Sequence, residues 1–292
     1  MFRGVYTAII TPFTDEGKVD WAALKNLVEF QIENKVAGIV PMGTTGESPT
    51  LDHEEHDEVI RKVIGWADKR CAVIAGTGSN STSEAIKLSQ HAEKAGADAC
   101  LVVNPYYNKP TQEGLYRHFK AVADCVKIPI VVYNIKGRTA VNVETPTLMR
   151  LIEGCDNITA VKEASGDIEQ IKDVIKQSPD DFSVLSGDDG ITLELIRAGG
   201  HGVVSVASNI IPDRMVGMVE NALEGNFKEA GVSDKELQKF FDGEFIETNP
   251  IPIKAALAMK GMCREVYRLP MCELRPENRE KWKKILTDMR VI

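Results

Sequence analysis

The sequence predicts an α/β fold, a (β/α)₈ TIM barrel with a C-terminal helical extension. Short β-branched runs alternate with amphipathic stretches whose apolar residues recur every three or four positions, and one unit takes about 25 to 30 residues. The runs are almost continuously apolar, as is typical of parallel strands buried on both faces. Eight units in roughly 220 residues suit a closed barrel, whereas the alternative, a doubly wound open sheet, usually has fewer strands.

Each expected strand is followed by an expected helix. The strands lie at residues 5–10, 38–42, 71–75, 99–103, 129–133, 158–162, 182–186 and 202–206. The helices lie at residues 20–34, 53–68, 83–94, 112–126, 145–154, 168–177, 190–198 and 211–223. Gly96 follows a helical stretch where a left-handed cap is favoured, and Ser81 to Glu84 are typical of a helix start.

The strand pattern stops after Leu223. We therefore divide the chain into a catalytic barrel, residues 1–224, and a helical region, residues 225–292. The second region contains the helix-breaking segments Asn249 to Pro252 and Leu269-Pro270. Because it is too short for a confident independent domain, we expect it to pack on the barrel.

Composition excludes several classes of function. The formal net charge of −8 and the lack of any Lys/Arg-rich run disfavour a nucleic-acid partner and favour a small molecule. Six cysteines show no CxxC spacing, which suggests a reducing compartment. No signal peptide is evident, and no apolar stretch reaches the ~18 residues of a membrane span. We expect a soluble cytoplasmic protein without a membrane partner.

The loops that follow the strands carry hydroxyls and small residues. The segment Gly43-Thr44-Thr45-Gly46 offers hydroxyls and backbone N–H groups ahead of a helix, which suits a carboxylate. It lacks the Gly-Lys-Ser/Thr of a phosphate loop, and Gly76-Thr-Gly-Ser lacks the third glycine of a dinucleotide motif. We expect no nucleotide cofactor.

His53 and His56 superficially suggest a metal face at a helix start. The sequence His-Glu-Glu-His does not fit the His-Glu-x-x-His spacing, and no third cluster of ligands is visible. A solvated helix start or a non-metal polar site is the better interpretation. We expect no metal.

One lysine, Lys162, ends the apolar run that begins at Ile158, and Tyr133 ends the run before it. The alternative is a lysine that extends to solvent beside Glu163. An amine attacks a ketone only when neutral, so burial must lower its pKa from ~10.4. Tyr133 and Thr44 are placed to move protons onto and off the carbinolamine oxygen without a metal.

Several motifs together resemble the dihydrodipicolinate synthase family, within the N-acetylneuraminate lyase superfamily of class I pyruvate aldolases. The resemblance covers essentially the whole chain. It rests on residues 43–48, 75–80, 105–110 with 112–116, Tyr133-Asn134 with 137–139, 161–163, 185–188 and 249–252. It implies a lyase that condenses pyruvate with L-aspartate-4-semialdehyde through a lysine Schiff base. The product would be 4-hydroxy-tetrahydrodipicolinate, in the first committed step of lysine and diaminopimelate biosynthesis.

The resemblance also implies roles for a catalytic set. Lys162 would form the imine with pyruvate, Tyr133 would relay protons, and Thr44 would link Tyr133 to Tyr107. In the family, the tyrosine at the position of Tyr107 reaches across a dimer interface. The resemblance therefore implies a homotetramer, a dimer of two tight dimers.

Four further positions match substrate-binding residues. Thr45 would hold the pyruvate carboxylate, and the backbone carbonyl of Val204 would line the pyruvate pocket. Arg138 would pair with the carboxylate of the aldehyde substrate, with a surface-loop cation as the alternative. Gly187 belongs to the same implied set.

Sister families share the lysine and the tyrosine, so a 2-oxo-acid aldolase such as 2-keto-3-deoxygluconate aldolase is the alternative enzyme. A catalytically silent barrel that senses a 2-oxo acid is the alternative from another class. Arg138 and the pair Tyr106-Tyr107 favour the synthase. Lys136 departs from the family, in which proline is common at that position.

The resemblance also implies feedback inhibition by L-lysine. The matching positions are Ser48, Pro49, His53, His56, Asn80, Glu84 and Tyr106. Pro49 replaces the usual alanine and keeps its carbonyl acceptor. This set gives the two histidines a role that needs no metal.

Overall fold

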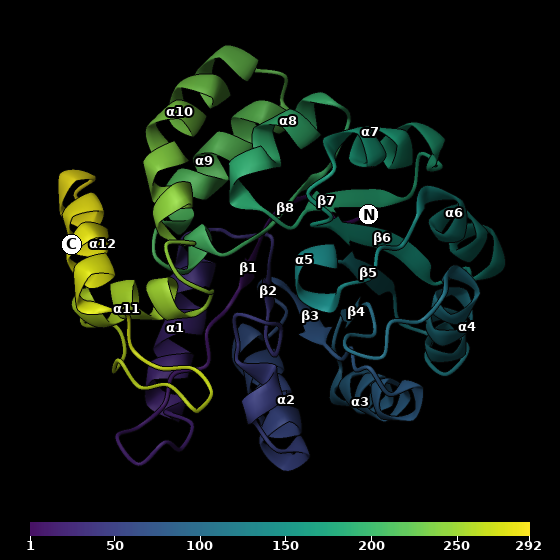
Figure 1. Cartoon of the computed structure of the whole chain (residues 1–292), viewed down its shortest axis with the longest axis horizontal. Coiled ribbons are helices and arrows are strands. Elements are labelled where there is room, and N and C mark those ends of the chain that lie inside the picture. Colours follow the sequence, from purple (N-terminus) through teal and green to yellow (C-terminus); the bar gives the residue numbers. More distant parts are fainter.

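A computed structural model describes residues 1–292 and contains a closed barrel of eight parallel strands in sequence order (Figure 1). The strands are β1 Gly4–Ala8, β2 Gly38–Val40, β3 Ala72–Gly76, β4 Ala99–Val103, β5 Ile130–Asn134, β6 Ile158–Glu163, β7 Ser183–Ser186 and β8 Gly202–Ser205. Strand β8 pairs with β1 and closes the ring. The predicted barrel is therefore confirmed.

Helices surround the barrel and continue beyond it. They are α1 Trp21–Glu33, α2 His53–Ala67, α3 Thr82–Ala95, α4 Gln112–Ala123, α5 Lys136–Thr139, α6 Thr145–Gly154, α7 Ile168–Gln177, α8 Thr192–Arg197, α9 Pro212–Leu223, α10 Phe227–Gly243, α11 Ile251–Met259 and α12 Pro276–Asp288. The periodicity did not predict α5, which has only four residues and begins at Lys136. The short helix α5 carries Arg138.

Local chemistry sets several element boundaries. Strand β2 ends at Val40, two residues earlier than expected, and Met42 adopts a left-handed φ of 58° that an extended strand excludes. Helix α3 ends at Gly96 with φ 93°, as expected for a glycine cap. Ser81 is the N-cap of α3 but makes no capping hydrogen bond, because its Oγ lies 3.1 Å from Ser83 Oγ instead.

The core has two parts. A small cluster inside the barrel contains Tyr6, Val40, Leu101, Tyr133, Leu185 and Val204 among its members. A much larger cluster joins the outer strand faces to the helices and includes Phe240 and Trp282 of the C-terminal region. In Figure 1, α10 lies along α9, and Trp282 Nε1 in α12 donates to Pro252 O at 2.7 Å. One continuous apolar core thus links residues 225–292 to the barrel.

Transmembrane helices are absent from this fold, since none of its helices combines the length and the apolar character that crossing a bilayer requires.

Candidate active site

The site begins with two neighbouring strands. Tyr133 in β5 and Lys162 in β6 are register partners, so their side chains lie on the same face of the barrel wall. Lys162 Nζ lies 4.1 Å from the centroid of the Tyr133 ring, and each residue is only 5% exposed. The sequence-predicted amine and phenol are therefore brought into contact.

Burial controls the protonation of the amine. It lowers the pKa of Lys162 from 10.5 to about 7, with a smaller contribution from the positive charge of Arg138. The Asp189 carboxylate acts in the opposite direction. A substantial fraction of the amine is thus neutral, and nucleophilic, near neutral pH.

The phenol is held in its protonated form. Burial raises the pKa of Tyr133 to about 12, while the positive charge of Arg138 and a hydrogen bond with the Thr44 hydroxyl oppose the shift. Tyr133 therefore has a proton to donate beside the amine, and Thr44 connects it to the loop after β2.

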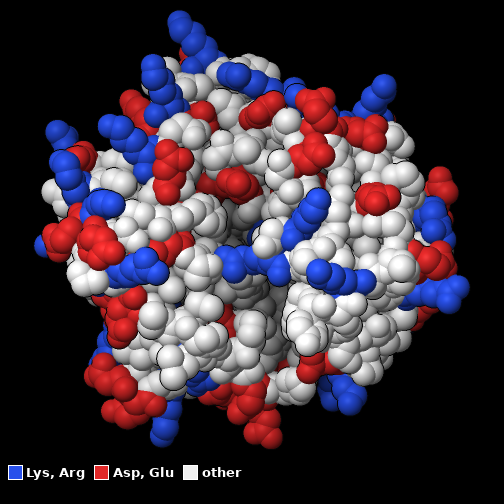
Figure 2. Space-filling view, in the orientation of Figure 1, with Lys and Arg blue, Asp and Glu red and all other residues white.

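A cavity of about 180 Å³ opens above Lys162. Figure 2 shows a hollow in the viewed face with Lys and Arg side chains beside it. The expected site residues lining this cavity are Thr44, Thr45, Tyr133, Arg138, Lys162 and Gly187. Asp188, Val206, Phe245 and Asn249 line it as well.

Gly187 leaves space for the amine. A Cβ at this position would lie 3.0 Å from Lys162 Cε and 2.7 Å from Ala164 Cβ. Any larger residue would press on the lysine chain, so the glycine keeps the reacting end of Lys162 free to move.

Asn249 connects two expected binding residues. Its Nδ2 donates to Thr45 Oγ1 at 2.9 Å, and its carbonyl oxygen accepts from Arg138 Nη2 at 3.0 Å. The sequence marks Asn249 as part of a helix-breaking segment and of the family motif at residues 249–252, but assigns it no role in the site. Its side chain is 204 residues from Thr45 along the chain, a distance over which periodicity carries no signal.

Val204 and Tyr107 lie outside this cavity. Val204 is buried in the inner layer of the barrel, and Val206, two residues later, reaches the cavity. Tyr107 is 88% exposed with φ 72°, and it lines neither this cavity nor the larger one beside it. Within one chain, Tyr107 is therefore not joined to the other three members of the expected catalytic set.

A larger cavity of about 370 Å³ adjoins the first and shares Thr44, Tyr133 and Arg138 with it. The expected lysine-site residues that line it are Ser48, Pro49, His53, His56, Glu84 and Tyr106. Asn80 is not among the lining residues, and its carbonyl oxygen accepts from Asn108 Nδ2 at 2.8 Å. The two cavities are therefore adjacent, and Thr44, Tyr133 and Arg138 form part of the wall of each.

The two histidines differ in environment. His53 Nε2 contacts Glu84 Oε1 at 2.8 Å on the exposed rim. His56 is buried, neither ring nitrogen has a hydrogen-bond partner, and desolvation lowers its pKa. No group of three or more His, Cys, Asp or Glu side chains converges as a metal site would require.

Two buried acids near the lysine, Asp189 and Glu244, were not predicted. Asp189 Oδ2 accepts from the N–H groups of Val206 at 2.8 Å and Ala207 at 3.0 Å. Burial raises the pKa of Glu244 well above its usual value, and the negative charges of Asp189 and Asp188 add to the rise. Glu244 follows α10, so only the folded chain places it beside the β7 loop.

A buried amine of lowered pKa beside a phenol, at one end of a parallel barrel, defines an enzyme site suited to carbonyl chemistry. The profile of the Dihydrodipicolinate synthetase family matches residues 1–289, and the chain belongs to this family.

Similar proteins agree over the full length. A 4-hydroxy-tetrahydrodipicolinate synthase of Syntrophus aciditrophicus is 52% identical over 292 residues, which is 100% of both chains. One from Methanocaldococcus jannaschii is 50% identical, again over 100% of both chains. The crystal structure of dihydrodipicolinate synthase from Aquifex aeolicus has a TM-score of 0.98, 48% identity and 99% coverage of each chain.

Two further solved structures contain small molecules. The chloride-inhibited synthase from Acinetobacter baumannii is complexed with pyruvate, at 42% identity, a TM-score of 0.98 and 100% coverage of both chains. The enzyme from Cyanidioschyzon merolae has lysine bound, at 40% identity, a TM-score of 0.97 and coverage of 100% of this chain and 99% of that one. The expected enzyme class, a lyase of lysine biosynthesis that condenses pyruvate, is confirmed by these comparisons, and the sugar-acid aldolase is not favoured.

Proposed function

We propose that this chain performs the synthase reaction through an imine between Lys162 and pyruvate, with L-aspartate-4-semialdehyde as the second substrate. The observation that carries the proposal is the contact between Lys162 Nζ and the Tyr133 ring, 4.1 Å from its centroid, inside the 180 Å³ cavity. The complex of the Acinetobacter baumannii enzyme with pyruvate supports the choice of first substrate.

The first step joins the amine to the ketone. Neutral Lys162 Nζ attacks C2 of pyruvate, and the former carbonyl oxygen takes a proton from the Tyr133 hydroxyl. The nitrogen of the adduct then gives one of its protons to the Tyr133 phenolate, and Tyr133 passes it to the same oxygen, so that water leaves and the protonated C=N bond forms. The Thr44 hydroxyl, a hydrogen-bond partner of Tyr133, orients the phenol for these transfers.

The imine then acts as an electron sink. Loss of a proton from the pyruvate methyl gives an enamine, whose carbon attacks the aldehyde carbon while the aldehyde oxygen gains a proton. Attack of the new intermediate's own amine on C2 expels Lys162 and closes the ring. The side chain of Lys162 is thereby regenerated as a neutral amine.

Two groups orient the carboxylates. Thr45 lies in the glycine-bordered loop after β2, and because its Oγ1 accepts from Asn249, its own O–H is free to donate to the pyruvate carboxylate. Arg138 lines both cavities and offers a guanidinium to the carboxylate of the aldehyde substrate. Gly187, which lines the cavity, would complete the pyruvate pocket.

Turnover distinguishes the two enzymes. The proposal expects rapid consumption of pyruvate with L-aspartate-4-semialdehyde and little cleavage of 2-keto-3-deoxygluconate. Faster reaction of the sugar acid would replace the synthase with the aldolase. No turnover of either, with pyruvate still bound, would favour the sensor.

We also propose that L-lysine inhibits the enzyme from the 370 Å³ cavity. Six of its lining residues belong to the expected set, and it shares Thr44 and Tyr133 with the catalytic cavity. The lysine-bound Cyanidioschyzon merolae structure supports a lysine site in the family. Activity that stays unchanged in millimolar lysine would contradict this proposal.

We further propose a cytoplasmic tetramer built from two dimers, with Tyr107 completing the neighbour's site. Its 88% exposure in one chain suits a residue that functions across an interface. Since one related solved structure is a monomeric variant, sedimentation must decide the assembly. A tetramer with a Tyr107→Phe variant of reduced kcat supports the proposal, whereas a fully active monomer would exclude it.

A further inference from the structure

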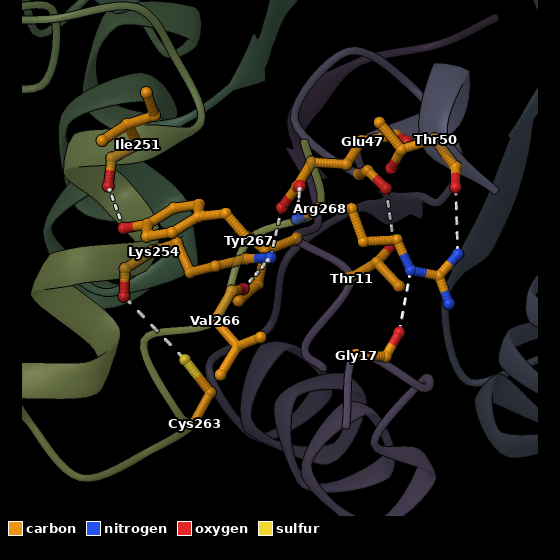
Figure 3. A network of polar contacts seen from close by, with 12 residues as sticks. Thr11, Gly17, Glu47, Thr50, Ile251, Lys254, Cys263, Val266, Tyr267 and Arg268 are labelled. Carbon is orange, nitrogen blue, oxygen red and sulfur yellow. Dashed lines mark hydrogen bonds and ion pairs between the residues drawn. The ribbon is translucent and has the colours of Figure 1, made fainter. Parts of the chain in front are cut away.

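A buried ion pair joins the C-terminal helices to the loop that carries Thr44 and Thr45 (Figure 3). Lys254 Nζ, in α11, contacts Glu47 Oε1, and the two side chains are 0% and 1% exposed. Lys254 Nζ also donates to Val266 O at 3.1 Å and lies 4.2 Å from the Phe13 ring centroid. We call Glu47, Lys254 and Arg268 the clamp.

Arg268 forms the second half of the clamp. Its backbone N–H donates to Glu47 Oε2 at 3.4 Å, and its Nη1 donates to Thr50 O at 3.0 Å. The guanidinium also makes a bidentate pair with Glu55, at 2.6 and 2.7 Å. Both ends of the segment from Glu47 to Thr50 are thus held by residues more than 200 positions away.

The held segment is continuous with the catalytic loop. Glu47 N–H donates to Thr44 O at 3.1 Å, and Glu47 adopts a left-handed φ of 55°. This conformation is uncommon for a non-glycine residue and is costly without supporting contacts. The clamp supplies such contacts, because Lys254 gives the buried Glu47 carboxylate its counter-charge.

The same helix region reaches the neighbouring threonine. Asn249, just before α11, donates to Thr45 Oγ1 at 2.9 Å. The C-terminal region therefore holds the loop at two points, on either side of Gly46. Burying a charged pair is expensive, and in some proteins such a pair is retained because it specifies one conformation.

We propose that Lys254 is a positioning residue, which, through Glu47, fixes Thr44 and Thr45 for pyruvate binding and proton transfer. This inference rests on the proposed function. Loosening the clamp should raise the KM for pyruvate and slow imine formation, while binding of the aldehyde substrate at Arg138 changes little.

The test uses the double variant Glu47→Gln/Lys254→Met, because either single change would leave a buried charge without its partner. The matched control is Glu265→Gln/Arg279→Met, which removes another ion pair of the same C-terminal region, one that makes no hydrogen bond to residues 43–50. Both are measured as full-length enzymes by thermal unfolding, amide hydrogen exchange of residues 43–50, and steady-state kinetics.

We expect exchange of residues 43–50 to accelerate at least about tenfold in the clamp variant and to match wild type in the control. The pyruvate KM should rise at least about fivefold, with less than a twofold change in the KM for aspartate semialdehyde. A folded clamp variant whose pyruvate KM matches the control would overturn the proposal, whether or not exchange accelerates.

A second variant and a measurement on the wild-type enzyme complete the test. If the double variant does not fold, Glu47→Asp, which keeps the charge but shortens the side chain that reaches Lys254 Nζ, should give the same direction of change in exchange and in pyruvate KM. Its unchanged behaviour would equally overturn the proposal. If wild-type enzyme forms no pyruvate adduct, the proposed function fails, and the exchange comparison alone then decides whether the clamp fixes the loop.

Discussion

Tyr133 and Lys162 are register partners across β5 and β6, so the barrel itself holds the phenol beside the amine. The next pair along, Asn134 and Glu163, is buried and linked by a hydrogen bond of 2.9 Å from Asn134 Nδ2 to Glu163 Oε1. This bond fixes the two strands in the register that brings the reacting groups together.

Removing the phenolic hydroxyl should stop proton relay but keep the ring. We expect Tyr133→Phe to lower kcat by about 10²- to 10⁴-fold, the range of a general acid–base group. Borohydride trapping of pyruvate on Lys162 should still occur, more slowly. Unchanged kcat would exclude Tyr133 as the relay.

The pH dependence of imine formation should follow the amine. Because burial lowers the pKa of Lys162 to about 7, the rate of adduct formation should reach half its maximum near pH 7 and fall about tenfold per unit below it. Rapid-quench trapping with pyruvate measures this rate. A rate that keeps rising up to about pH 10, as for an ordinary lysine, would contradict the assignment.

Lys162 should cost stability at neutral pH. Its folded pKa of about 7 lies below the ordinary 10.5, so between these values the folded state binds fewer protons and the unfolding free energy rises with pH. Lys162→Met should therefore stabilise the protein at pH 7, by at most about 5 kcal/mol, and flatten this dependence. Urea unfolding at pH 7 and about pH 9 measures the change of unfolding free energy with pH. The same change in wild type and in Lys162→Met would contradict the prediction.

Gly187 should be intolerant of a methyl group. Gly187→Ala places a carbon 3.0 Å from Lys162 Cε, and we expect imine formation to slow by about 10- to 100-fold. Gly65→Ala, in α2 with no atom within 4 Å of the new carbon, is the control and should keep full activity. Equal rates of imine formation in the two variants would contradict the prediction, because the close contact at residue 187 would then not hinder Lys162.

Glu84 should contribute to lysine inhibition. Its carboxylate lines the larger cavity, and hydrogen bonds with Ser79 and His53 lower its pKa, so it stays ionised opposite an ammonium group. Glu84→Ala should raise the inhibitory lysine concentration about tenfold, or about 1.4 kcal/mol of binding, without altering uninhibited kcat. The exposed Glu54→Ala variant should leave inhibition unchanged. An equal rise of the inhibitory lysine concentration in both variants would mean that the net charge of the protein, and not a contact with Glu84, controls inhibition.

Local patterns predicted the parts of the site that lie at strand ends. Apolar runs ending in Tyr133 and Lys162 were sufficient to expect a barrel with an amine at its active face, and the hydroxyls of Thr44 and Thr45 follow β2 directly. The roles of Arg138 and of the lysine-site set came from resemblance alone, because neither a four-residue helix nor the polar start of a longer helix has a periodicity that marks function.

Long-range contacts were not predictable in this way. Lys254 and Glu47 are 207 residues apart, and Asn249 and Thr45 are 204 apart, so their pairing depends on how the C-terminal helices pack. The proximity of Asp189 and Glu244 was likewise not predictable, because Glu244 follows α10 and only the packing of that helix brings it near Asp189. Tyr107 differs again, because any role for it requires a second copy of the chain.

The central claim is that Lys162 is the amine that captures pyruvate. Borohydride reduction of the enzyme with pyruvate, followed by peptide mass spectrometry, tests it directly. The account predicts a reduced pyruvyl adduct on Lys162 and none in Lys162→Met. An adduct on another lysine, or none in active wild-type enzyme, would contradict it.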